Sequence, residues 1–240
     1  MADQATTNRT LTHYEELSFG VRLGDFMILE TAICSFLAVA IFLTFALWNA
    51  WKAVDDQSRR RHKWIFLSSA SDYYLLALLF FDLILCTGQI LDARWVHLGH
   101  IVTGPYCLTQ GTFQQTGDVG VALANLAIAC HTFAVLFFRW KPPTSRWLPL
   151  SVILVICLIL FLATLIPGLK LKGTNWGIAT DWCWISPHYT WLQLGLEYFI
   201  FWAVALILFI LYIPLFFCLR GNIYVDLGTE DWGRGKMRIS

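Results

Sequence analysis

Five stretches of the chain are long and apolar enough to cross a lipid bilayer. A hydrocarbon core about 30 Å thick needs about 20 consecutive, mostly apolar helical residues. Stretches of this size occupy residues 26–48, 73–90, 107–138, 147–166 and 194–219. In the third, the helix is expected to begin near Cys107, and its apolar run begins at Val119. The pattern predicts an all-α membrane protein with a helical bundle over residues 26–219, an N-terminal segment 1–25 and a tail 220–240.

Composition supports a membrane environment. Hydrophobic residues make up 58% of the chain and charged residues 14%, against roughly 45–50% and about 25% in a typical soluble domain. The 12 tryptophans suit the membrane interface, where amphipathic rings collect. A formal net charge of +1 gives no reason to expect a nucleic-acid partner. The lipid bilayer is therefore the first expected partner.

The positive charges predict an orientation, because cytoplasmic loops collect Lys and Arg. Twelve of the 17 Lys and Arg residues fall on one side of a five-span topology, in the loop after the first span, the loop after the third and the tail. The other five are Arg9, Arg22, Arg94, Lys170 and Lys172. We expect the N-terminus outside and the C-terminus in the cytoplasm. Asn8, in an Asn-Arg-Thr sequon, is then a candidate glycosylation site, although so short a pattern also arises by chance.

The cysteines divide by position. Five of the seven lie within the spans, where a thiol packs as a small apolar group. Only Cys107 and Cys183 lie outside, and both fall on the face expected to be oxidising. A disulfide between them would join the loop after the fourth span to the start of the third helix. Two free thiols are the alternative.

Polar residues near the outer ends of two helices are candidates for a ligand pocket. If the third helix begins at Cys107, Gly111, Gln114, Gln115 and Asp118 follow an i, i+3, i+4, i+7 pattern and share one face. A second pair, Gln193 and Glu197, lies one turn apart at the start of the fifth span. Such a set suits a small polar ligand such as a sugar, a nucleotide or an amino-acid-like molecule. A merely hydrated vestibule is the alternative.

One carboxylate lies deep in the membrane. Asp82 is in the middle of the second span, where a charge costs about 2.5–3.5 kcal/mol on insertion scales, so we expect it to face the bundle interior. It either joins helices by hydrogen bonding or forms a polar site beneath the ligand pocket, with Asn125 as a candidate partner. His97 and His100 have a spacing compatible with a metal, but without a third ligand we interpret them as solvated and expect no metal site.

Several motifs in order resemble those of one receptor class. Cys107-Leu-Thr-Gln-Gly111, followed by Gln114, Gln115, Gly117 and Asp118 and then by Ala127-Ile-Ala-Cys-His-Thr-Phe133, is similar to helix 3 of fungal G-protein-coupled receptors of the glucose-sensing and cyclic-AMP-receptor-like class. Trp182-Cys-Trp-Ile185 resembles the Cys-Trp-Ile element in the second extracellular loop of cyclic-AMP-type and secretin-type receptors. Leu211-Tyr-Ile-Pro-Leu215 and Leu219-Arg-Gly-Asn-Ile223 also look like the fungal proteins. The resemblance covers roughly residues 20–224.

The resemblance implies a function. It suggests that the five spans correspond to helices 1 to 5 of a seven-helix receptor in the plasma membrane, which senses a nutrient or small polar ligand and signals through a heterotrimeric G protein to cyclic AMP. Arg139, Trp140, Lys141 and Arg220 would then lie on the G-protein side. No catalytic motif or phosphate-binding glycine loop occurs, so we expect neither an enzyme nor a cofactor.

The chain also departs from that class. Only 21 residues follow Leu219, with no apolar run long enough to span, so the sequence contains no counterparts of helices 6 and 7. The Asp-Arg-Tyr triplet of rhodopsin-like receptors is missing, and His131-Thr-Phe133 lies near its expected depth. Two alternatives therefore remain, a truncated receptor fragment that does not signal and a small multi-span transporter.

Overall fold

The computed structural model describes residues 14–55, 69–141, 145–169, 176–179, 182–220, 223–226 and 236–239. Most of these residues are helical. Five helical segments among them are long and apolar enough to span a membrane: Phe19–Asn49, Ala70–Leu98, Pro105–Phe137, Trp147–Thr164 and Pro187–Leu219. The predicted number and order of spans are confirmed, and they indicate a multi-pass membrane protein.

The helices are longer than the apolar runs that identified them. They are α1 (Phe19–Asp55), α2 (Ala70–Ile90), α3 (Ala93–Leu98), α4 (Pro105–Phe137), α5 (Trp147–Leu169), α6 (Thr190–Gln193) and α7 (Phe199–Leu219). A 3₁₀ turn η1 (Pro187–Tyr189) precedes α6, and a π-helical turn η2 (Leu194–Tyr198) joins α6 to α7. Helix α1 begins seven residues before the predicted span, because polar residues such as Arg22 and Asp25 extend the helix beyond its apolar stretch.

Short strands occur outside the spans, which the apolar pattern did not predict. They form three antiparallel pairs: β1 (Tyr14–Glu16) with β2 (His100–Val102), β3 (Trp176–Ala179) with β4 (Trp182–Ile185), and β5 (Ile223–Asp226) with β6 (Lys236–Ile239). The first pair connects the chain before α1 to the segment before α4. The last pair lies in the tail. The protein is therefore mainly helical rather than entirely so.

Local sequence sets where two of the helices begin. At α2, Ser69 and Asp72 form a capping box, in which the Asp72 Oδ2 accepts a 2.9 Å hydrogen bond from the Ser69 backbone N–H. At α4, Pro105 occupies the first turn, where the missing N–H costs nothing.

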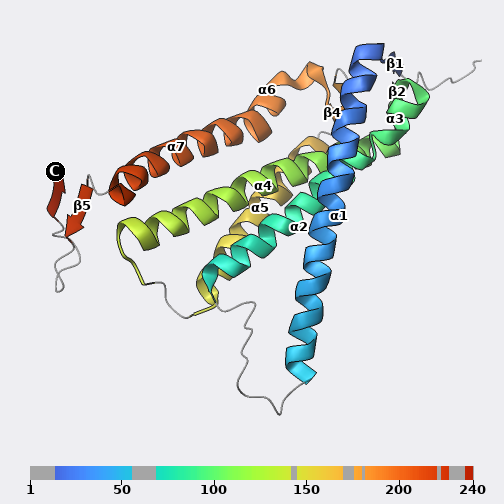
Figure 1. The fold of residues 1–240 in the computed structure, drawn as a ribbon. Helices are drawn as coiled ribbons and strands as arrows, with labels where there is room; N and C mark the ends of the chain where they lie inside the picture. The colour runs from blue at the N-terminus through green and yellow to red at the C-terminus, as the bar shows by residue number, and fades with distance from the viewer. Residues whose placement is uncertain are drawn as a thin grey trace, which may run out of the picture.

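Helix α4 is the centre of the bundle and contacts α2, α5 and α7 (Figure 1). Glycine permits its close approach to α2, because a Cβ atom at Gly117 would lie 2.5 Å from the Leu85 Cα. At Gly120, a Cβ would meet the ring of Phe81 at 2.6 Å. Below this contact a buried apolar cluster joins α2, α4 and α5 through Phe81, Val119, Ala124, Ile156 and Leu160. Helix α1 lies across α2 (Figure 1).

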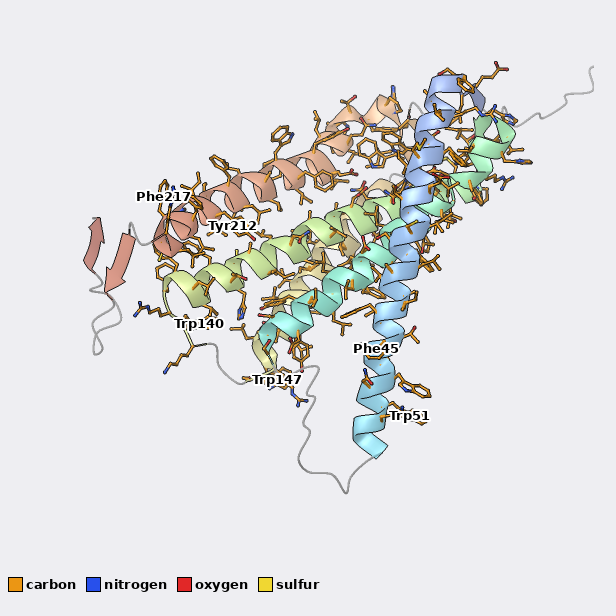
Figure 2. The ribbon with its side chains drawn as sticks, viewed as in Figure 1. Phe45, Trp51, Trp140, Trp147, Tyr212 and Phe217 are labelled. Carbon is orange, nitrogen blue, oxygen red and sulfur yellow. A yellow bond between two sulfur atoms is a disulfide. The ribbon has the colours of Figure 1, made fainter. Side chains whose placement is uncertain are left out.

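Large apolar side chains cover the outside of the bundle. Phe45 on α1, Trp147 on α5 and Phe217 on α7 project from their helices, as Figure 2 shows, and are 64%, 81% and 40% exposed. A soluble monomer rarely exposes so continuous an apolar surface. Lipid is the environment that these side chains fit.

Candidate functional site

The predicted disulfide is present. Cys107, in the first turn of α4, is bonded to Cys183 in β4, with 5.1 Å between their Cα atoms. Both residues are buried, in a cluster with Trp95 and Ile101. The other five cysteines are free. The bridge holds the β3–β4 hairpin against the beginning of α4.

Gly111 has a packing role in this arrangement. A Cβ atom at this position would lie 2.8 Å from the Trp176 ring and 2.9 Å from the Cys183 carbonyl oxygen. The hairpin can rest on α4 only because residue 111 has no side chain. Gly111 therefore shares the face of the predicted polar stripe, but it accommodates the hairpin rather than a ligand.

Gln115 joins three elements with its side-chain amide. The Trp184 indole Nε1–H of β4 donates to Gln115 Oε1 at 2.6 Å, and Gln115 Nε2 donates to the Leu196 carbonyl of η2 at 3.2 Å. Gln115 is only 1% exposed. Its main hydrogen-bonding groups are thus used to connect α4, the hairpin and η2.

Gln193 has a similar structural contact. Its Nε2 donates to the Ile185 carbonyl at the end of β4, at 2.7 Å. The side chain therefore points back towards the hairpin, and it helps to fix where α6 leaves β4.

Asp118 and Glu197 are the two carboxyl groups among the predicted ligand-pocket residues. The two carboxyl groups lie close enough to interact electrostatically. The Glu197 Oε2 atom is buried and has no hydrogen-bond partner within the part of the chain that the structure describes. The structure thus brings Gln115, Asp118 and Glu197 together beneath the β3–β4 hairpin. We call these three residues and Trp184 the hairpin site.

Gln114 belongs to a different network. Its Nε2 donates at 3.3 Å to Oδ2 of Asp92, which lies between α2 and α3. Its Cγ packs against Gly88, where an added Cβ atom would lie only 2.9 Å from it. Gln110 also donates to Asp92 and accepts a hydrogen bond from the Trp95 indole N–H. The predicted stripe is therefore divided. Gln114 faces α2 and α3, whereas Gln115 and Asp118 face η2.

Sequence reasoning had not assigned Asp92 or Trp95 to this network. Asp92 follows the second apolar run directly, and Trp95 lies one turn later, so both looked like loop residues. Both are buried, Asp92 at 7% and Trp95 at 1% exposure. The sequence signal that could have indicated their burial is the position of a carboxylate and an indole so close to the end of a span.

The Asp82 carboxylate is hydrogen-bonded to a neighbouring helix. Its Oδ2 accepts a 3.1 Å hydrogen bond from the Ser35 hydroxyl of α1, so it joins α1 to α2. Asn125, the candidate partner on α4, is exposed on the surface of its helix. The contact agrees with the helix-joining interpretation of Asp82 rather than with a pair of Asp82 and Asn125.

The residues predicted for the G-protein side differ in exposure. Arg139 and Lys141 are exposed, and Arg220 lies over the Phe216 ring at 5.7 Å. Trp140 instead turns inward and packs edge-on against His131, with 6.0 Å between the ring centroids. Asn8, the predicted glycosylation site, lies outside the described residues.

No protein-family profile matches the chain, and no curated protein sequence matches it significantly.

Proposed function

We propose that the protein is a receptor-like membrane protein of the G-protein-coupled type, which senses a nutrient or another small polar ligand at the hairpin site. The proposal includes a location in the plasma membrane with the N-terminus outside, and signalling through a heterotrimeric G protein to cyclic AMP. The motif resemblance supports the receptor class. The observation that carries the proposal is the hairpin site itself.

The hairpin site has features that a small-molecule site needs. A covalently anchored hairpin covers it, and Trp184 and Gln115 hold the surrounding elements in place. The unpartnered Glu197 Oε2, together with Asp118, can accept hydrogen bonds from ligand hydroxyl or amino groups. A few fixed polar groups next to aromatic side chains are typical of ligand sites.

The other end of the bundle suits a partner on the opposite side of the membrane. Arg139 and Lys141 follow α4, and Arg220 follows α7, so cations occur at the ends of two neighbouring helices. Their positions agree with the excess of Lys and Arg that predicts the cytoplasmic face. A G protein is the partner that the motif resemblance implies.

Binding is tested directly with the purified full chain and a panel of probes, namely glucose, cyclic AMP and a neutral amino acid. Binding of one probe should raise the Tm in detergent. Glu197→Gln should weaken the binding of that probe roughly 2- to 10-fold, since it replaces one carboxyl oxygen and a hydrogen bond contributes about 0.5–1.5 kcal/mol. Glu30→Gln, the same change on an exposed position of α1, is the matched control. Equal binding by wild type and Glu197→Gln would remove the hairpin site from the proposal.

Signalling is tested in cells. Cyclic AMP is measured after each probe is added, in cells with and without the gene. A probe-dependent rise that requires the gene supports coupling to a G protein. Binding in vitro without any cyclic AMP response would contradict the signalling half of the proposal and leave a ligand-binding membrane protein.

A further inference from the structure

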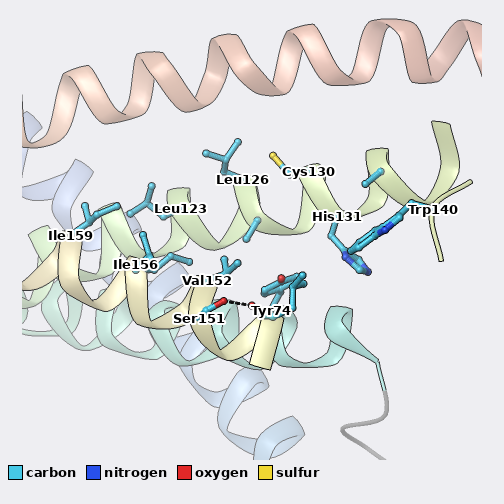
Figure 3. A pocket seen from close by; sticks show the side chains of 14 residues that line it. Tyr74, Leu123, Leu126, Cys130, His131, Trp140, Ser151, Val152, Ile156 and Ile159 are labelled. Carbon is cyan, nitrogen blue, oxygen red and sulfur yellow. Dashed lines mark hydrogen bonds between the residues drawn. The ribbon is translucent and has the colours of Figure 1, made fainter. Parts of the chain in front are cut away.

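A cavity of about 540 Å³ lies between α2, α4 and α5 (Figure 3), and none of its lining residues belongs to the hairpin site. On α4 it begins at Leu123 and reaches Ala134, and Trp140 closes one end. The hairpin site, by contrast, belongs to the first half of α4. The volume is within the range of about 300–1,000 Å³ that is usual for small-molecule sites.

The cavity has an apolar length and a polar end. Leu123, Ile156 and Ile159 line the end nearer the middle of the bundle, whereas Tyr74, His131 and Trp140 gather at the other (Figure 3). The Ser151 hydroxyl donates to the Leu148 carbonyl at 2.8 Å, so its proton is used within α5. The lining therefore matches an elongated apolar molecule with one small polar group.

Two polar side chains at the polar end have no hydrogen bond to another residue that the structure describes. Tyr74 is 3% exposed and packs edge-on against His131, with 5.7 Å between the ring centroids. Within the described ranges, no residue hydrogen-bonds the Tyr74 hydroxyl or a ring nitrogen of His131. A polar group without a partner in hydrocarbon costs free energy, so a ligand hydroxyl that bonds to both would be stabilised.

The cavity opens onto the membrane-facing surface. Two of its lining residues, Cys130 on α4 and Val155 on α5, are exposed, Val155 at 53%. Since lipid surrounds this surface, a membrane molecule can enter from the side. No route through water is needed.

We propose that this cavity binds a membrane sterol. The hydroxyl would exchange hydrogen bonds with Tyr74 and His131, and the rigid apolar body would lie along Leu123, Ile156 and Ile159. The phosphate of an anionic phospholipid would instead stay with the exposed cations Arg139 and Lys141, and its chain would leave the Tyr74 hydroxyl unpaired. The chemistry of the polar end therefore favours a neutral alcohol.

The first test uses a photoactivatable sterol and the full chain in phosphatidylcholine vesicles. Labelling should map to peptides of α2, α4 and α5, and unlabelled sterol should compete. Val155→Trp, which fills the mouth of the cavity, should reduce labelling at least 5-fold. Leu154→Trp is the matched control, because Leu154 is 69% exposed and does not line the cavity. Equal labelling of both variants, or competition by phosphatidylserine but not by sterol, would overturn the proposal.

The second test examines the hydroxyl contact. Tyr74→Phe keeps the ring and removes one hydrogen bond, so sterol affinity should fall roughly 2- to 10-fold. A sterol whose hydroxyl is replaced by hydrogen should bind wild type and Tyr74→Phe equally. If wild type does not prefer the hydroxylated sterol, the assigned polar end is wrong.

Discussion

Gly117 shows how much one residue contributes to the packing of this bundle. The backbone of α2 passes so close that a Cβ at residue 117 would lie 2.5 Å from the Leu85 Cα. A backbone atom cannot move aside as the tip of a flexible side chain can. The close contact of α2 with α4, and with it the position of the buried apolar cluster, depends on this glycine.

We predict that Gly117→Ala destabilises the protein. Overpacking costs about 1–3 kcal/mol, which corresponds to a fall in Tm of roughly 3–10 °C for a chain of this size. Thermal unfolding in detergent measures it. Gly24→Ala is the control, because nothing lies within 4 Å of a Cβ at Gly24 and alanine favours a helix there. Equal Tm values for the two variants would mean that α2 and α4 are not in such close contact.

Trp184 has a comparable role at the hairpin site. In Trp184→Phe the buried Gln115 Oε1 loses its 2.6 Å hydrogen bond, and an unsatisfied buried acceptor costs about 1–3 kcal/mol. Amide hydrogen exchange in β4 should become faster, because the hairpin opens more often. Trp182→Phe changes an exposed side chain two residues away, so it should leave amide hydrogen exchange in β4 nearly unchanged. The same acceleration in both variants would argue against the contact with Gln115.

At the scale of elements, the β3–β4 hairpin is positioned by α4 and α6 rather than by its own sequence. Four residues in each strand are too few to be stable alone. The disulfide, the Gly111 contact and the Gln193 hydrogen bond all hold it from outside. The π-helical turn η2 then brings Leu196 and Glu197 towards α4, which places the fifth span against the hairpin site.

The disulfide between the hairpin and α4 is open to a direct test. Reduction should change the gel mobility of the wild type, and Cys183→Ala should abolish that change. Cys157→Ala, which removes an exposed free thiol, should keep it. Because the bridge closes a loop with a sequence separation of 76, its loss should cost about 2–5 kcal/mol. A mobility change that persists in Cys183→Ala would mean that another pair is oxidised.

At the scale of the whole molecule, the bundle has an apolar exterior and two candidate sites at different levels along α4. The hairpin site lies near the start of α4, and the proposed sterol cavity near its end. The buried apolar cluster of Phe81, Val119 and Ile156 adjoins the cavity, because Ile156 also lines it. Ligand binding at one end and sterol binding at the other are therefore separate proposals with separate tests.

Orientation belongs to this scale as well. With twelve Lys and Arg residues on one side and five on the other, we expect the C-terminus in the cytoplasm. An epitope at the C-terminus should be stained by antibody only after cells are permeabilised, and one at the N-terminus should be stained in intact cells. Use of Asn8 for glycosylation should give an endoglycosidase-sensitive band that Asn8→Gln removes. The reverse staining pattern would invert the topology and move the hairpin site to the cytoplasmic side.

The sequence by itself determined the number of spans, their order and the disulfide pair. Hydropathy is a local property, so an apolar run is visible wherever it occurs, and only Cys107 and Cys183 lay outside such runs. Helical spacing also grouped Gln115, Asp118 and Glu197 with Gln114 and Gln193 as candidates for one ligand pocket. Helical spacing could not show that Gln114 contacts different neighbours from Gln115 and Asp118.

Tertiary packing decided which side chains meet. Successive residues of a helix differ in direction by about 100°, so Gln114 and Gln115 lie beside different neighbours once α2, α3 and η2 are in place. For the same reason Asp82 met Ser35 rather than Asn125, and Trp140 turned inward to His131. The cavity at Tyr74 exists only between three packed helices. No run of residues along the chain contains it.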